Sequence, residues 1–218
     1  MKRFRRTQRQ KAGRNGLALC LLGTVLLLLS SSVLTLFPGQ AIRYEERYAG
    51  TGETTVITHL STGYGTFYLS ANENALLVTP FHRGLRTPPH PNGSARVGWY
   101  GWSEASACDL TEQKGSFCAH CFTAQREGTE GWSLTQIYGR VDMEGANSVT
   151  GWNRDEPGLS PKTQSLIRGK DRHAYFWFLT EGTAEAPGPL YTDFTILDRN
   201  GKPLGQYHLS PLRPFLYL

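Results

Sequence analysis

The chain has few cysteines, little helical periodicity and none of the short motifs that identify common enzyme classes. Only four cysteines occur among its 218 residues. It contains no GxSxG, HExxH, Walker or dinucleotide-binding glycine motif, and its acidic residues lack the spacing of a calcium-binding loop. The sequence therefore identifies no catalytic residue, and we expect a protein that is not an enzyme.

A net positive charge is present only at the start of the chain, and this argues against a nucleic-acid partner. The formal net charge is +5, but seven basic residues and no acidic ones lie within residues 1–15. The rest of the chain carries 16 Lys and Arg against 18 Asp and Glu, a net charge of −2. A nucleic-acid-binding domain needs clustered positive charge on its folded surface. We therefore expect no nucleic acid to bind here.

Residues 16–37 contain no charged side chain, and this run of 22 residues predicts a transmembrane signal-anchor helix. Such a helix is roughly 33 Å long, enough to cross a hydrocarbon layer of about 30 Å. The basic block 1–15 then predicts a cytoplasmic tail, and the remainder lies outside the cytoplasm. Membrane lipid is thus the expected partner of residues 16–37. The alternative is a secretory signal that is cleaved near Ala41, which would release the domain.

After the predicted anchor we expect a juxtamembrane linker, 38–53, and a mainly β extracytoplasmic domain, 54–218. Short runs rich in β-branched and aromatic residues alternate with turn sequences. Residues 132–142 alternate between two faces, whereas 174–180 are apolar on both faces and predict a central strand. The pattern predicts an antiparallel β-sandwich, immunoglobulin-like in the broad sense. Two small β-modules that split near 103–131 are the alternative.

Three cysteines fall within the fourteen residues CDLTEQKGSFCAHC. Outside the cytoplasm thiols tend to oxidise, so a disulfide from Cys108 to Cys118 or Cys121 is the first expectation. A structural zinc site built from these cysteines and a histidine such as His120 is the second, because Cys-x2-Cys is a usual ligand spacing. Against it, His120 directly precedes Cys121, and neighbouring residues rarely bind one ion. Free thiols are the third possibility, and in each case we expect a structural role.

Two stretches are candidate ligand sites. The first is the aromatic group Trp99, Tyr100 and Trp102, whose rings could stack on sugars if they are exposed. In a strand the two tryptophans would face opposite sides, so at least one is expected in the core.

The second candidate is the loop 82–94, which lacks a strand pattern. It carries His82, Arg83, Arg86 and His90, which could hold an anionic ligand. The ordinary interpretation is a solvated connection between strands.

Together these features predict a membrane-anchored extracytoplasmic module that binds a protein or a glycan. One alternative is a secreted or anchored hydrolase of cell-surface polymer, which predicts converging carboxylates or a histidine–carboxylate pair at strand ends. The other is a small module stabilised by zinc at Cys108, Cys118 and Cys121. The apolar C-terminal residues 215–218 are expected to dock on the domain's own sheet or on a partner.

Overall fold

The computed structural model describes residues 2–30, 34–86, 96–101, 106–111, 116–126, 131–183, 188–209 and 215–217. Side chains are described for residues 13–27, 35–83, 106–111, 116–123, 131–183 and 188–209. The elements are α1 (Lys2–Ser30), β1 (Leu34–Thr35), α2 (Pro38–Ala49), β2 (Thr55–Thr62), β3 (Gly65–Ala71), β4 (Ala75–Arg86), β5 (Arg96–Gly101), β6 (Ser106–Asp109), β7 (Phe117–Arg126), β8 (Trp132–Val141), β9 (Ser148–Trp152), β10 (Lys162–Ser165), β11 (Ile167–Arg168), β12 (Ala174–Thr183), β13 (Asp193–Leu197), β14 (Pro203–His208) and β15 (Phe215–Tyr217).

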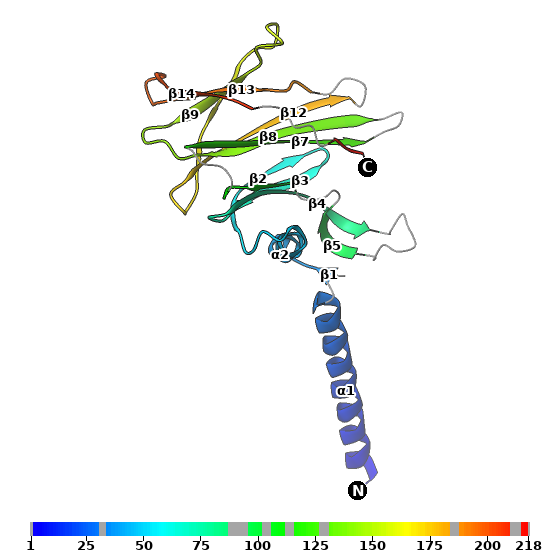
Figure 1. Ribbon diagram of the computed structural model, residues 1–218. Coiled ribbons are helices and arrows are strands. Elements are labelled where there is room, and N and C mark those ends of the chain that lie inside the picture. Colours follow the sequence, from blue (N-terminus) through cyan, green and yellow to red (C-terminus); the bar gives the residue numbers. More distant parts are fainter. Residues whose placement is uncertain are drawn as a thin grey trace.

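The described strands form three sheets that stack as three layers (Figure 1). The N-terminal sheet has the order β1-β5-β4-β3-β2, with β6 also paired to β4. The central sheet has the order β11-β12-β8-β7-β15, and the outer sheet has the order β10-β9-β13-β14. All the described ladders are antiparallel except β1 with β5 and β15 with β7. The mainly β prediction is confirmed, and the arrangement is consistent with a β-sandwich that has a third layer.

The central sheet separates two hydrophobic cores, because successive residues of a strand point to opposite faces. Between the N-terminal and central sheets lies the thiol core, which includes Phe67, Leu69, Leu76, Val78, Cys108, Cys118, Phe122, Leu134, Tyr138, Tyr175 and Trp177. Between the central and outer sheets lies the aromatic core, which includes Ile137, Val149, Phe176, Phe178, Tyr191, Phe194 and Ile196, with Phe117 and Tyr207 packed against it. The predicted alternation of 132–142 and the two-sided burial of 174–180 are both confirmed.

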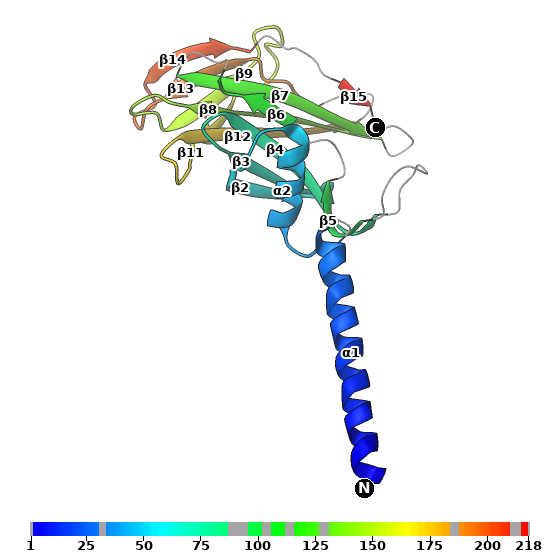
Figure 2. The ribbon, with the colours of Figure 1, turned by 60° about the horizontal axis from the view of Figure 1, so that its bottom comes forward.

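Residues 38–53, expected to be a linker, contain the amphipathic helix α2. Its Ala41 and Ile42 pack against Phe81, on the face of the N-terminal sheet opposite the thiol core. Figure 2 shows α2 lying across this sheet. The carboxylate of Glu46 is buried and accepts a hydrogen bond of 2.7 Å from the backbone N–H of Thr54. The expected linker thus includes a helix that was not predicted, although proline is favoured in a first helical turn and Pro38 begins α2.

The helix predicted over residues 16–37 has different bounds. Helix α1 runs from Lys2 to Ser30, and Leu34 and Thr35 then pair with β5 as part of the N-terminal sheet. Among the described residues, no helix combines the length and the apolar character needed to cross a membrane. Residues 28–34 of the predicted span lie outside the described side chains.

The C-terminal segment returns to the domain. Its strand β15 pairs in parallel with β7 at the edge of the central sheet. Docking of this segment on the domain's own sheet is therefore confirmed for the backbone.

Candidate functional site

The cysteine-rich stretch forms two strands in different sheets. Strand β6, with Cys108, pairs with β4 in the N-terminal sheet, and β7 pairs with β8 in the central sheet. Cys118 and Cys121 are three residues apart on β7, so they point to opposite faces. Cys118 lies in the thiol core, whereas Cys121 packs against the aromatic core. A disulfide or a single metal ion joining Cys118 to Cys121 does not fit this arrangement.

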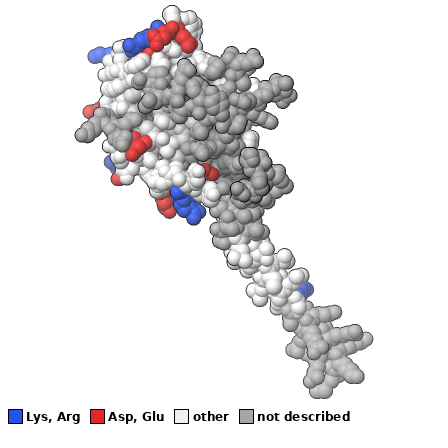
Figure 3. All heavy atoms as spheres, turned by 45° about the vertical axis from the view of Figure 1, so that its right-hand side comes forward, with Lys and Arg blue, Asp and Glu red and all other residues white. Residues whose placement is uncertain are grey.

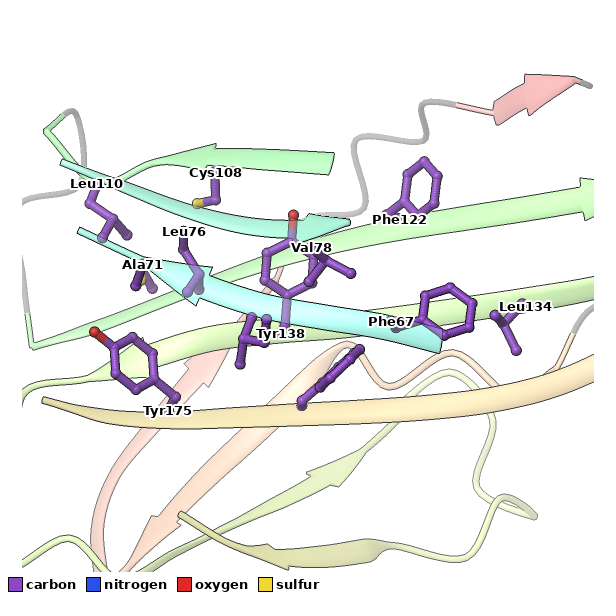
Figure 4. Close-up of a cluster of buried hydrophobic side chains, with 13 residues drawn as sticks. Phe67, Ala71, Leu76, Val78, Cys108, Leu110, Phe122, Leu134, Tyr138 and Tyr175 are labelled. Carbon is purple, nitrogen blue, oxygen red and sulfur yellow. The ribbon is translucent and has the colours of Figure 1, made fainter. Parts of the chain in front are cut away.

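Cys108 and Cys118 meet inside the thiol core, although they come from different sheets. Both side chains are buried, and the thiol of Cys108 donates a hydrogen bond to the sulfur of Cys118. The backbone N–H of Arg140 donates another to the same sulfur, at 3.3 Å. Figure 4 shows Cys108 pointing into this core above Leu76. The cysteines are free thiols in the structure, so the predicted disulfide is not present there.

The three cysteines differ in pKa because their surroundings differ: the pKa is raised for Cys108 and Cys121 and lowered for Cys118. The hydrogen bond to Cys118 is the main reason why the pKa of Cys108 is raised, and burial raises it further. The same hydrogen bond lowers the pKa of Cys118, against the effect of burial and with help from the N–H of Arg140. Burial raises the pKa of Cys121 to about 11. Cys118 is therefore the most easily ionised of the three.

The predicted zinc site is not assembled by the described residues. They contain no group of three or more His, Cys, Asp and Glu side chains that could hold a metal ion. His120 follows the same alternation as Cys118, but its ring packs beside that of Tyr138, with the centroids 5.6 Å apart. Burial lowers the pKa of His120, which favours the neutral ring.

Strands β4 and β5 bring the two predicted ligand sites together on one hairpin. In their antiparallel register, His82 lies opposite Tyr100 and Arg83 lies opposite Trp99. Residues directly opposite each other in such a pair belong to the same face of the sheet. Arg83 is exposed, and burial lowers the pKa of His82.

Other members of these two candidate sites are only partly described. Arg86 lies opposite Arg96 near the end of the hairpin. The side chains of Arg86, Trp99 and Tyr100 are outside the described set, and His90 and Trp102 lie outside the described residues altogether. The structure therefore brings the aromatic site and the basic site together through the pairing of the β4 and β5 backbones.

Two histidine–aspartate pairs lie at ladder ends, and the sequence interpretation had not singled them out. At the end of the β8–β12 ladder, Nδ1 of His173 lies 2.6 Å from Oδ1 of Asp142. The Nε atom of Arg140 lies 2.8 Å from the other oxygen of that carboxylate. No sequence motif links these residues, which are neighbours only because of the strand register.

The second pair joins His208 on β14 to Asp193 on β13, directly opposite each other. Nδ1 of His208 lies 3.0 Å from Oδ1 of Asp193, whose side chain is buried. Burial acts to raise the pKa of Asp193, but hydrogen bonds from Arg154, Thr192 and His208 outweigh it and hold that pKa below its usual value. Among the described residues, neither His173 nor His208 has its ring hydrogen-bonded to a hydroxyl or thiol.

Charge on the described surface is mixed in sign. On the face shown in Figure 3, basic and acidic side chains are interspersed, with no broad patch of one sign among the residues drawn in colour. No protein-family model matches the chain, and no curated protein or solved structure matches it either.

Proposed function

We propose that the chain is a single-pass membrane protein that presents a non-enzymatic binding module outside the cytoplasm. The basic block 1–15 and the uncharged run 16–37 support this topology. Helix α1 extends away from the three sheets (Figure 1). A helix that is apolar on all sides needs an apolar environment. Exposed apolar side chains surround only the second half of α1, after its basic first half: Leu17, Leu19, Leu21, Leu22, Val25, Leu26 and Leu27.

The segment between α1 and α2 supports a position of the domain at the membrane surface. Leu36 is 50% exposed and Phe37 is 65% exposed, directly before Pro38 begins α2. Apolar and aromatic side chains of this kind suit the interface between lipid and water. Since Thr35 already belongs to the N-terminal sheet, the domain would begin within a few residues of the lipid.

The binding proposal depends on one observation, the register of the β4–β5 hairpin. It sets Arg83 opposite Trp99 on one face of the hairpin and His82 opposite Tyr100 on the other face, since neighbouring residues of a strand point to opposite sides. The Arg83–Trp99 pair is the cationic one, because burial favours the neutral ring of His82. Cationic and aromatic residues side by side suit a ligand with both negative charge and sugar rings. We infer that the ligand is an anionic glycan of the cell surface.

The topology is tested by adding protease to intact cells that produce the full chain. We expect the β-rich domain to be digested from outside, while the tail 1–15 remains protected until the cells are lysed. Protection of the domain in intact cells, with digestion only after lysis, would contradict the proposed location.

The ligand is tested by retention of the detergent-solubilised full chain on an immobilised acidic polysaccharide. We expect Arg83→Ala and Trp99→Ala each to weaken retention about tenfold, equivalent to about 1.4 kcal/mol. Arg199→Ala is the matched control, because Arg199 is also exposed but lies in the β13–β14 turn of the outer sheet. Equal retention of all these variants would refute the hairpin as the binding surface.

The hydrolase alternative is favoured by the two histidine–aspartate pairs, which match part of its expectation. Each pair leaves Nε2 of its histidine free of the aspartate. A general base still needs a nucleophile or a water to act on. Loss of polymer-cleaving activity in both His173→Ala and His208→Ala would support this alternative over the binding module.

A further inference from the structure

No strand ladder joins the N-terminal sheet to the central sheet among the described residues. These two layers are held together through side chains of the thiol core. Polar contacts also cross between them: the hydroxyl of Tyr138 on β8 lies 2.8 Å from both the backbone and the side-chain oxygen of Ser106 on β6. A covalent bond between the layers would add a connection that the backbone does not supply.

The geometry points to a disulfide between Cys108 and Cys118 that ties the N-terminal sheet to the central sheet; this rests on the proposed location outside the cytoplasm. The two cysteines belong to one buried cluster, and their sulfurs are within hydrogen-bonding reach. In a disulfide, a covalent bond between the sulfurs of Cys108 and Cys118 takes the place of the hydrogen bond between them. Cys121 is excluded as a partner, because it lies on the opposite face of β7.

The bond forms by thiol–disulfide exchange with a disulfide oxidant such as a thiol oxidoreductase of the exported compartment. Cys118, as thiolate, attacks one sulfur of the oxidant, giving a mixed disulfide and releasing one oxidant thiolate. Cys108 then loses its proton to that thiolate and attacks the Cys118 sulfur, releasing the second oxidant sulfur. In sum, two cysteines are oxidised by two electrons and one oxidant disulfide becomes two thiols.

The surroundings suit Cys118 for the attacking role. In the closed domain two donors, the thiol of Cys108 and the N–H of Arg140, stabilise its thiolate and lower the pKa of Cys118. Both sulfurs are buried there, so an external oxidant reaches them only when the two sheets are apart. The N–H of Arg140 still serves Cys118 in that state, because β7 and β8 belong to the same sheet.

The link would also steady the proposed binding hairpin. Strand β6 pairs with the first part of β4, from Ala75 to Val78, and β5 pairs with the second part, from Phe81 to Arg86. Fixing β6 to β7 therefore fixes the strand that carries His82 and Arg83 against the central sheet. The disulfide would thereby hold the proposed binding strand in place.

The test maps the cysteines of the full chain taken from membranes. Free thiols are alkylated in denaturant, without reductant, and the chain is cut with trypsin. Cleavage after Arg96, Lys114 and Arg126 leaves Cys108 in peptide 97–114, and Cys118 and Cys121 in peptide 115–126. We expect these two peptides to be linked, with Cys121 alkylated. The link should persist in Cys121→Ser and disappear in Cys118→Ser.

Two outcomes would overturn the proposal. One is alkylation of all cysteines in a chain whose domain is shown by protease to be external. The other is a link through Cys121 in place of Cys118. If the protease assay instead finds the domain inside, the location fails and the pairing is tested separately. The chain is then unfolded in urea and refolded with oxidised glutathione, and a Cys108–Cys118 link upholds the pairing whereas any other result refutes it.

Discussion

The two faces of the central sheet are covered by cores of different chemistry. The aromatic core is held mainly by ring contacts: the ring of Phe176 lies 5.4 Å from that of Phe117 and 5.7 Å from that of Phe194, centroid to centroid. The thiol core contains polar groups that need partners, among them the hydroxyl of Tyr138 and the two cysteine sulfurs. One core depends on buried area, and the other also depends on specific polar contacts.

This difference predicts where the molecule responds to its surroundings. Apolar burial is insensitive to redox state and to pH, so the attachment of the outer sheet should be constant across compartments. The thiol core contains a dithiol, and a half-buried histidine, His120, lies beside its Tyr138. The attachment of the N-terminal sheet, which bears the proposed binding hairpin, should therefore depend on the compartment.

The largest effect is expected from Phe176→Ala in the aromatic core. Phe176 is fully buried, and its ring covers Gly139, where an added Cβ would lie 2.6 Å from the ring. Removing the ring should lower the free energy of unfolding by about 3–5 kcal/mol. Urea unfolding of the full chain in detergent measures this, with and without reductant. A loss that depended on reductant would break the distinction between the cores.

The next effect is that of reducing the proposed disulfide. A cross-link closing a loop of this size stabilises by about 3 kcal/mol, so reductant should lower the free energy of unfolding by about that amount. Cys118→Ser should be insensitive to reductant, whereas Cys121→Ser, on the aromatic side, should respond like the unmodified chain. The comparison would fail if reductant left the stability of the unmodified chain unchanged.

A smaller effect is expected from Tyr138→Phe. The hydroxyl of Tyr138 lies 2.8 Å from both the carbonyl and the side-chain oxygen of Ser106, and burial raises the pKa of Tyr138. Its removal leaves buried oxygens without that donor, at a cost of about 1–3 kcal/mol. Tyr207→Phe is the control, because its hydroxyl contact with Ser116, at 3.0 Å, is only partly buried. Equal losses in both variants would show that burial of the polar contact does not matter.

Several strands of the fold follow from the residue pattern of a single segment, whereas the order of the strands follows from which distant segments pair. Alternation predicted the strand at 132–142 and two-sided burial predicted the central strand at 174–180, since both depend on the residues of one segment. The outer layer could not be predicted in the same way, because strand order depends on which distant segments pair. Helix α2 was missed because Pro38 is compatible with both a helix end and a helix start.

For the candidate sites, the sequence identified the right residue types and left their partners open. Spacing alone made Cys118 and Cys121 a plausible pair for zinc. The strand geometry of β7 sets them on opposite faces, and only the register of β6 brings Cys108 to Cys118. Likewise, Arg83 and Trp99 were separate candidates until the β4–β5 register set them opposite each other.

The smallest effect expected is the pH dependence of the thiol core. Burial lowers the pKa of His120, so below about pH 6.5, the usual histidine pKa, the unfolded chain binds more protons than the folded one. The His120 contribution to stability is therefore complete above that pH and is lost progressively as the pH falls towards the lowered pKa. Urea unfolding between pH 7.5 and pH 5 should show a shallower decline for His120→Gln than for the unmodified chain.

His82→Gln is the matched control for this titration. Burial lowers the pKa of His82 as well, but His82 lies on β4 beyond the stretch paired with β6, outside both cores. Each substitution should remove its own part of the decline, because the two rings are buried at different places. If His120→Gln left the decline unchanged, the titrating group would not be the ring beside Tyr138, and the thiol core would be no more sensitive to pH than the aromatic core.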